Sequence, residues 1–398
     1  DPMSELKKVL IVTYYWPPAG GPAIQRTLKF VKYMRFFGWE PVILTVENGE
    51  YPAIDPSLIQ EIPDNIQVYK TKAFQPFQLY RMLTGKKGNT HNNANVFGQK
   101  DKTFVERLAK WIRLNLFIPD ARIGWYAYAV KAAKKIIEQE HIDLIYSSSP
   151  PHSLQLIAQK IAKQNKIKWV ADFRDPWSEL VHYQSYKRTW LTRKIDSHFE
   201  KSVFRSADRL VAAANDYATC IKTHVDRKIE VIYNGYDPSD FPKPKSKNTE
   251  DFLITYTGEL SEDRIPHALL RALSRLEDSN IKLQFIGNTC PELKQEIQQL
   301  NLGNKVILKP YMPHIASIAE LQQSDLLLLV INQVANGKGI VPGKIFEYLG
   351  TRKPILCLGD PTGEAGEIIK TTNSGFCIAH HNEEEIFILL SRLSSGVL

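Results

Sequence analysis

A lysine and a glutamate in this chain of 398 residues stand one helical turn apart, at a place where a helix can begin. Lys344 follows Pro342 and Gly343, which favour a helix start, and Glu347 comes about one turn later. The first backbone N–H groups of a helix have no partner within it, so they attract anions, and Lys344 adds a full positive charge. A helix start that binds phosphate, beside a carboxylate that can hold a ribose diol, suits a sugar nucleotide. The alternative interpretation is an ordinary helix–strand unit with a surface lysine and glutamate.

A second candidate anion site is the loop from Gly258 to Arg264, which follows the apolar run 252–257. The guanidinium group of Arg264 stays charged and matches the geometry of phosphate oxygens, so it is a candidate clamp for a diphosphate. A solvated loop arginine is the alternative.

Near the N-terminus, Gly20 and Gly21 precede a helical stretch that carries Gln25, Arg26 and Lys29. Glycine lets backbone N–H groups approach a phosphate or sugar, although a tight strand–helix turn explains the same residues. The pattern is not GxGxxG, so it does not favour a dinucleotide site.

Two further groups of polar residues follow predicted strands of the first half. His152 lies between a strand and a helix, where it is either a catalytic group or a brace for the turn. Asp172, Arg174 and Asp175 stand together at the end of another strand. They form either a structural ion-pair cluster or a site in which Asp175 orients an acceptor hydroxyl, with Trp177 as a platform for sugar or lipid.

These residues must be positioned by strands that alternate with helices along the whole chain, which predicts two doubly wound, Rossmann-like α/β domains. We expect a first domain over 1–235, a linker rich in proline and lysine over 236–250, and a second domain over 251–398. Ligands of such sheets bind beyond the carboxyl ends of the strands, so a cleft between the two domains is expected. We expect the helix after Gly343 to end at Gly350, and the polar stretch 84–101 to form a mobile loop.

Composition limits the partners and the compartment. The net charge of +8 favours anionic partners, but no nucleic-acid-binding pattern is present. The four cysteines are scattered without a CxxC pair, so neither a zinc site nor a disulfide framework is indicated. No apolar run is long enough to span a membrane, and residues 7–13 are typical of a strand rather than a secretion signal. These features predict a cytoplasmic protein with, at most, peripheral membrane contact.

The stretch 102–137 is the candidate for that contact. It combines apolar residues at helical spacing with basic ones, as interfacial helices do on anionic lipid, although a packed amphipathic helix gives the same pattern. The apolar residues are Phe104, Val105, Leu108, Trp111, Ile112, Leu116 and Phe117, and the basic ones are Lys102, Arg107, Lys110, Arg113, Lys131, Lys134 and Lys135.

Several of these segments, in this order, resemble the GT-B glycosyltransferases, in particular the retaining family 4 (glycosyl transferases group 1) of bacterial surface-polysaccharide synthesis. Residues 231–238 (VIYNGYDP) resemble the turn that closes the first domain of that family, and residues 14–22 (YYWPPAGGP) resemble its first glycine-rich loop. Residues 171–177 (ADFRDPW) and 342–348 (PGKIFEY) resemble motifs of the polysaccharide-building subgroup. Residues 256–264 (YTGELSEDR) occupy the place of its phosphate loop.

The resemblance implies transfer of a sugar from a UDP- or GDP-sugar to a hydroxyl of a lipid-linked or polysaccharide acceptor, at the inner face of the plasma membrane. It implies retention of anomeric configuration and no metal or other cofactor. The residues expected to act in catalysis are His152, Asp175, Arg264 and Lys344. Those expected to bind the donor are Gly20, Gly21, Gly258, Arg264, Gly343, Lys344 and Glu347, with Lys344 neutralising the diphosphate and Glu347 holding the ribose hydroxyls.

The chain departs from the family at three places. Glu259 stands where the family has an arginine, with Arg264 in place of a nearby lysine, and Gly339 stands where many relatives carry the first glutamate of an E-x7-E pattern. The chain also ends soon after residues 383–390, where relatives have a longer C-terminal helix, which indicates a shortened C-terminus. These departures keep two alternatives open: a sugar-nucleotide epimerase or hydrolase on the same fold, and a non-catalytic GT-B scaffold subunit.

Overall fold

A computed structural model describes residues 6–51, 54–74, 104–177, 188–243, 250–276, 279–333 and 337–396. The predicted loop 84–101, Lys102 and residues 244–249 of the predicted linker lie outside them. Within them the chain divides into two compact units, with the division between Tyr233 and Asn234. The predicted domain limits and linker remain predictions, and the described part of that linker belongs to the second unit.

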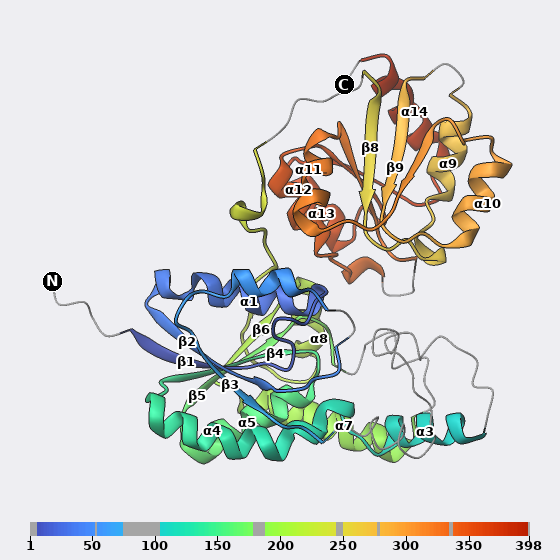
Figure 1. Ribbon diagram of the computed structural model, residues 1–398. Coiled ribbons are helices and arrows are strands. Elements are labelled where there is room, and N and C mark those ends of the chain that lie inside the picture. The colour runs from blue at the N-terminus through green and yellow to red at the C-terminus, as the bar shows by residue number, and fades with distance from the viewer. Residues whose placement is uncertain are drawn as a thin grey trace. The chain divides into compact units, whose positions relative to one another are not determined.

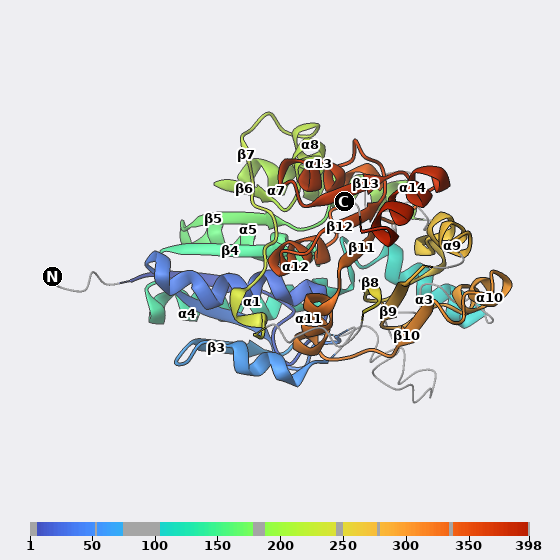
Figure 2. The ribbon, with the colours of Figure 1, turned by 90° about the horizontal axis from the view of Figure 1, so that it is seen from above.

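The first unit is built on a parallel sheet of seven strands in the order β3-β2-β1-β4-β5-β6-β7 (Figures 1 and 2). The strands are β1 (Lys7–Val12), β2 (Trp39–Val46), β3 (Gln67–Thr71), β4 (Leu144–Ser149), β5 (Lys168–Phe173), β6 (Arg209–Ala212) and β7 (Ile229–Val231). β1 lies between β2 and β4, so the chain builds the sheet in one direction up to β3 and in the other from β4 onward.

Helices cover both faces of this sheet. One apolar core forms under α1 (Pro22–Met34) and the short turn η2 (Pro56–Glu61). The core of the other face includes residues of α4 (Tyr126–Glu140), α5 (Ser153–Asn165), α7 (Trp190–Ser206) and α8 (Asn215–Lys222). The remaining elements are η1 (Arg35–Phe37), α3 (Phe104–Asn115) and η4 (Ala121–Trp125). The stretch 102–137 therefore divides between α3 and the start of α4, with η4 between them.

The second unit has a parallel sheet of six strands in the order β10-β9-β8-β11-β12-β13. The strands are β8 (Phe252–Thr257), β9 (Ile281–Ile286), β10 (Val306–Lys309), β11 (Leu326–Val330), β12 (Ile355–Leu358) and β13 (Gly375–Ile378). The core on one face includes residues of α9 (His267–Ser274), α10 (Pro291–Gln299) and α14 (Glu383–Ser394). Figure 1 shows α11 (His314–Gln323), α12 (Lys344–Thr351) and α13 (Glu364–Thr371) on the other face. The short turns are η5 (Pro238–Asp240), η6 (Glu262–Arg264) and η7 (Gly337–Gly339).

Both sheets therefore confirm the predicted doubly wound α/β architecture. The reversal of strand order falls between β1 and β4 in the first sheet and between β8 and β11 in the second. In open α/β sheets, ligands bind outside the carboxyl ends of the strands at such a point. The predicted loops after β1 and β4 and after β8 and β11 lie at these two points.

The predicted end of α12 at Gly350 was wrong. The helix continues to Thr351, and Arg352, with a φ of 59°, supplies the left-handed residue at its end. Gly350 is needed for close packing instead, because an added Cβ would lie 2.4 Å from the Phe241 ring. Among the described residues, no helix combines the length and the apolar character that crossing a membrane requires.

Candidate functional site

Lys344 is the first residue of α12, and its side chain reaches the end of β8. Its ammonium group donates to the backbone oxygen of Thr257 at 2.5 Å and to the hydroxyl of Tyr256 at 3.0 Å. Tyr348, one turn further along α12, holds the helix in place: its hydroxyl donates to Leu328 of β11 and accepts from the Thr257 N–H, both at 3.2 Å. The positively charged group is thus fixed at the point where the strand order reverses.

Gly258 provides the space beside this lysine. Its φ is +110°, a conformation that other residues rarely adopt, and an added Cβ would lie 2.6 Å from the Lys344 Nζ atom. Gly287, after β9, packs against it in turn, since a Cβ there would lie 2.4 Å from the Gly258 oxygen. Both glycines are required for the close approach of backbone and ammonium group.

Arg264, on η6, contributes a second cation. Its guanidinium donates to the Asn332 side chain at 3.0 Å and to the Glu259 backbone oxygen at 3.3 Å. Asn332, which follows β11, also donates to Asp263 at 2.7 Å, so the loop after β8 and the loop after β11 are joined. The structure brings together the predicted residues Gly258, Arg264 and Lys344.

The electrostatics of this group favour an anion. Burial, and then the nearby charge of Arg264, lower the pKa of Lys344 from 10.5 to about 7. Two positive charges held this close repel each other, and an anion between or beside them relieves that repulsion. A site that is rich in cations and depresses the pKa of one of them is suited to a diphosphate.

Glu347 lies one turn into α12, half-buried, with its Oε1 atom 3.1 Å from the Nε2 atom of His314, the first residue of α11. This histidine was not predicted from the sequence. Gly343 is the N-cap of α12 and is exposed, and its surroundings leave room for a ligand, since nothing lies within 4 Å of an added Cβ. Gly339 is buried in η7, and its neighbour Lys338 pairs with Asp360 at 3.1 Å.

In the first unit the two predicted glycines differ. Gly20 is buried, and an added Cβ would lie 3.0 Å from the Cβ of Asp55, so its small size serves packing. Gly21 is exposed at the N-cap of α1 with a φ of +93°, and an added Cβ would meet nothing within 4 Å. Of the two, Gly21 is the one that a ligand can approach.

His152 is buried, with 1% of its surface exposed, and its ring stacks on Trp177 at 4.7 Å between centroids. Neither ring nitrogen has a hydrogen-bond partner among the described residues. Burial, with a smaller contribution from Arg174, lowers the pKa of His152 to about 3, so the ring is neutral at physiological pH. The side chain does not cap α5, because Asp120 accepts from the N–H and hydroxyl of Ser153 there.

The predicted cluster of Asp172, Arg174 and Asp175 separates into different environments. Asp172 is fully buried and accepts two hydrogen bonds from Arg26, at 2.8 and 2.9 Å, so Arg26 is a structural residue rather than a ligand contact. Tyr146 also donates to this carboxylate, at 2.9 Å. Arg174 instead donates to backbone oxygens of Ser149 and Pro150.

Asp175 is half-buried and lines a small pocket together with Trp177, Glu200, Tyr217 and other residues of α7 and α8. Trp177 itself is 1% exposed, and its indole N–H donates to Asp196 at 2.8 Å. It therefore offers no exposed face as the predicted sugar or lipid platform.

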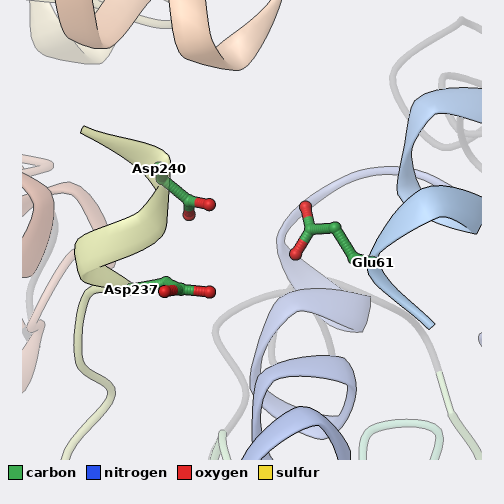
Figure 3. A group of neighbouring side chains, drawn as sticks. All are labelled: Glu61, Asp237 and Asp240. Carbon is green, nitrogen blue, oxygen red and sulfur yellow. The ribbon is translucent and has the colours of Figure 1, made fainter. Parts of the chain in front are cut away.

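Asp237 is the N-cap of η5 and Asp240 is its last residue, and Figure 3 shows both carboxylates on the same side of this turn. Asp237 accepts from the N–H and the hydroxyl of Ser239, at 2.9 and 2.8 Å, and so caps the turn. Glu61, the third residue labelled in Figure 3, belongs to the first unit and pairs there with Lys29.

Tyr256, His314 and Asn332 complete the site in the second unit. Tyr256 was predicted only as the first residue of the phosphate-loop segment 256–264, and His314 and Asn332 were not predicted. Asn332 directly follows the apolar run 326–331, and a polar residue at a strand end is a signal that the sequence does contain. His314 carries no such signal, because only the packing of α11 beside α12 brings it to Glu347.

Two family models match the chain, one in each half. The model described as Glycosyltransferase Family 4 matches residues 94–240, and the model described as Glycosyl transferases group 1 matches residues 238–395. A comparison with curated protein sequences gives no match.

Solved structures resemble the chain along nearly its whole length. Anabaena Alr3699/HepE in complex with UDP is 15% identical, with a TM-score of 0.62 over 98% of this chain and 91% of that one. The lipopolysaccharide outer core galactosyltransferase WaaB is 13% identical, with a TM-score of 0.57 over 98% and 90%. A putative UDP-N-acetylglucosamine 2-epimerase from Listeria monocytogenes is 11% identical, with a TM-score of 0.53 over 98% and 88%.

At these identities the structural likeness shows the fold. The two family models together span most of the chain and overlap at residues 238–240, a few residues after the division between its two units. The chain belongs to the GT-B glycosyltransferases, with a family 4 first domain and a group 1 second domain.

Proposed function

We propose that this glycosyltransferase moves a sugar from a UDP-sugar to a hydroxyl group of a lipid-linked saccharide in surface-polysaccharide synthesis. The observation that carries the donor assignment is the pair of cations, Lys344 and Arg264, held at the reversal point of the second sheet. They lie beside a glycine loop and the start of α12, which adds the positive end of a helix dipole.

In the proposed reaction the bond between sugar and diphosphate breaks, and negative charge develops on the departing diphosphate. Lys344, Arg264 and the first N–H groups of α12 stabilise that charge without reorganising, because Tyr256, Thr257 and Asn332 already hold the two side chains. Removal of one such donor typically raises the activation free energy by about 3 kcal/mol. Since these groups neutralise the diphosphate, we expect transfer without an added divalent metal, and no other cofactor.

Glu347 is the proposed ligand of the ribose hydroxyls, with His314 setting the direction of its carboxylate. On the acceptor side, we assign Gly21 to a ligand that approaches the backbone, and Asp175 to an acceptor hydroxyl. His152 is buried like Trp177, but its two ring nitrogens have no partner among the described residues, so we assign it a hydrogen bond with a sugar hydroxyl. A neutral imidazole can still donate and accept one hydrogen bond each, which suits a sugar hydroxyl.

The relatives support the choice of donor and of process. HepE is described in complexes with UDP and with UDP-glucose, and WaaB is a lipopolysaccharide galactosyltransferase. GDP-sugars remain the second donor class to test. Retention of configuration, and a location at the cytoplasmic face of the plasma membrane, follow the family resemblance.

Calorimetric titration with UDP, UDP-glucose and GDP tests the donor site. We expect UDP to bind, Lys344→Met to weaken binding by at least tenfold, and Glu347→Gln to weaken UDP more than inorganic diphosphate. Lys294→Met is the matched control, because this exposed lysine lies on α10, which packs on the opposite face of the sheet. Unchanged UDP affinity in the Lys344 and Glu347 variants would contradict the site.

Analysis of the reaction products distinguishes a glycosyltransferase from the two alternatives, an epimerase or hydrolase and a non-catalytic scaffold subunit. Turnover of UDP-sugar without an acceptor would favour an epimerase or hydrolase, and the Listeria neighbour gives that alternative a structural precedent. A folded protein that binds no nucleotide and shows no turnover would favour a scaffold subunit.

A further inference from the structure

The end of α3 is joined to the start of α7 by one buried asparagine. Asn115 is 5% exposed, and its side-chain oxygen accepts from the Thr189 N–H at 2.8 Å and from the Thr192 hydroxyl at 3.0 Å. Arg188 adds a hydrogen bond to the Leu114 backbone oxygen at 3.3 Å. Residues far apart in sequence thus form one corner of the first unit, where Figure 1 draws α3 beside α7.

Large apolar side chains project into solvent around this corner. Trp190, next to Thr189, is 73% exposed, and Trp111, whose backbone oxygen accepts from the Asn115 side chain at 3.0 Å, is 46% exposed. Three leucines of the same two segments are also exposed: Leu108, Leu116 and Leu191. Clustered apolar exposure of this kind marks a surface that meets a partner.

The tryptophans make the corner distinctive. The chain has seven, of which Trp16, Trp125, Trp169 and Trp177 are at most 2% exposed, and Trp39 is half-buried. The two exposed ones, Trp111 and Trp190, come from the two helices that are joined at this corner. Tryptophan combines a large apolar ring with a polar N–H, which suits the boundary between lipid headgroups and acyl chains.

Positive charge surrounds the apolar corner. Arg193 and Lys194 are exposed on the first turns of α7, and the Lys194 Nζ atom lies 5.9 Å from the centroid of the Trp190 ring. The acidic residues of α7 are turned inward instead, since Asp196 and Glu200 are both 3% exposed.

The same helical layer continues the charge. α5 packs beside α7 and exposes Lys160 and Lys163, and its sequence contains no acidic residue. α4 packs on α5 and exposes three further lysines and one glutamate: Lys131, Lys134, Lys135 and Glu138. Charge complementarity therefore selects an anionic surface as the partner of this layer.

We propose that the corner of α3 and α7 (Leu108, Trp111, Leu116, Trp190 and Leu191) inserts at the headgroup level of an anionic lipid bilayer. The lysines and arginines of α4, α5 and α7 contact lipid phosphates beside it. This inference rests on the proposed function and adds to it, because the surface would bring the enzyme to the membrane that carries a lipid-linked acceptor. It extends the expected lipid contact of 102–137 to α5 and α7, which the sequence pattern did not include.

Vesicle flotation with the full chain tests the surface without donor or acceptor. We expect retention on phosphatidylcholine vesicles that contain 30% phosphatidylglycerol, little retention on pure phosphatidylcholine, and release at high salt. Trp190→Ser with Leu191→Ser should lower the partition coefficient at least tenfold. The matched control is Phe36→Ser with Phe37→Ser, which alters two still more exposed aromatic residues of η1 in the same unit and should leave partitioning unchanged.

Brominated lipid provides a readout of insertion. We expect quenching of tryptophan fluorescence in the wild type and its loss in the Trp111→Phe, Trp190→Phe double variant. Equal binding to neutral vesicles, or wild-type binding by the Trp190, Leu191 variant, would overturn the proposal. The proposal would also be overturned if the wild type bound no vesicles but self-associated, and the Trp190, Leu191 variant did not self-associate. Flotation requires no nucleotide, and UDP affinity is measured separately on the same variants. A failure of the membrane proposal can therefore be distinguished from a failure of the proposed donor site.

Discussion

The ammonium group of Lys344 lies 4.1 Å from the centroid of the Tyr256 ring and donates a hydrogen bond of 3.0 Å to the hydroxyl of that tyrosine. The contact joins the first residue of α12 to the end of β8 and removes the ammonium from much of the solvent. The lysine is therefore positioned before any ligand arrives, at the cost of a depressed pKa.

Nucleotide binding should take up a proton. With a pKa of about 7, Lys344 is mostly neutral at pH 8, and a bound diphosphate favours its charged form. We expect UDP affinity to fall as pH rises above about 7. Calorimetry at pH 8 in two buffers of different ionisation enthalpy should show uptake approaching one proton. Lys344→Met should abolish it, and equal uptake in the variant would exclude Lys344 as the proton acceptor.

A rise in pH should lower UDP affinity through Lys344 but raise the free energy of unfolding through the same residue. Its pKa falls from 10.5 to about 7 on folding, so between these values the unfolded chain holds a proton that the folded protein has released. The free energy of unfolding contributed by this group therefore rises with pH across that window. Urea unfolding at pH 7 and pH 9 should show a rise that is smaller in Lys344→Met, and a variant that keeps the full rise would contradict this assignment.

Two glycines of the donor site should respond differently to alanine. Gly258→Ala places a side chain at a φ of +110° and within 2.6 Å of Lys344, so we expect a loss of about 1–3 kcal/mol of stability and weaker UDP binding. Gly343→Ala, at a φ of −54° in open space, should fold as the wild type does. Thermal unfolding of the two variants compares them, and equal midpoints would show that the space at Gly258 is not required.

Replacing His152 by phenylalanine should preserve the fold. The ring stacks on Trp177, and its nitrogens have no partner among the described residues, so an aromatic ring without nitrogens loses no internal hydrogen bond there. We expect a change in stability of less than about 1.5 kcal/mol, as for other swaps of similar volume, together with a large loss of transfer activity. Retained activity would make His152 a packing residue.

The pH dependence of the His152 variant provides a second test. The pKa of His152 lies at about 3 in the folded protein, below its usual value of 6.5, so the unfolded chain binds more protons between these values. Stability from this group is therefore present above pH 6.5 and is lost as the pH falls toward 3. Acid unfolding of His152→Phe should begin at a lower pH than that of the wild type, and coincident curves would contradict the pKa.

The buried pair of Arg26 and Asp172 should be essential for folding rather than for chemistry. Arg26→Met leaves a buried carboxylate without its cation, which typically costs about 3–5 kcal/mol. We expect urea unfolding at lower denaturant and unchanged UDP affinity in the fraction that folds. The double variant Arg26→Met, Asp172→Leu should recover part of the loss, and a double variant as unstable as the sum of both changes would exclude the coupling.

The sequence predicted most of the strands and the loops that follow them, because apolar runs and glycine positions are local signals. It did not predict the edge strands β3 and β13. It could not predict which polar side chains pair across the fold. Arg26 and Asp172 are 146 positions apart, and nothing in either local segment indicates that the two side chains pair. The contact of His314 with Glu347 and that of Thr189 with Asn115 at the end of α3 arise in the same way, through packing of helices that no local pattern encodes.

The place of β1 inside its sheet has a consequence for synthesis on the ribosome. β1 pairs with β4, and the Lys8 N–H is bonded to the carboxylate of Asp143, 135 positions later. A nascent chain that has emerged only as far as β3 therefore exposes one unpaired edge of β1, whose residues 9–12 are buried in the complete sheet. We expect the first unit to remain dependent on chaperones until β4 leaves the exit tunnel, so rare codons placed before residue 144 would favour aggregation and those placed after β7 would not.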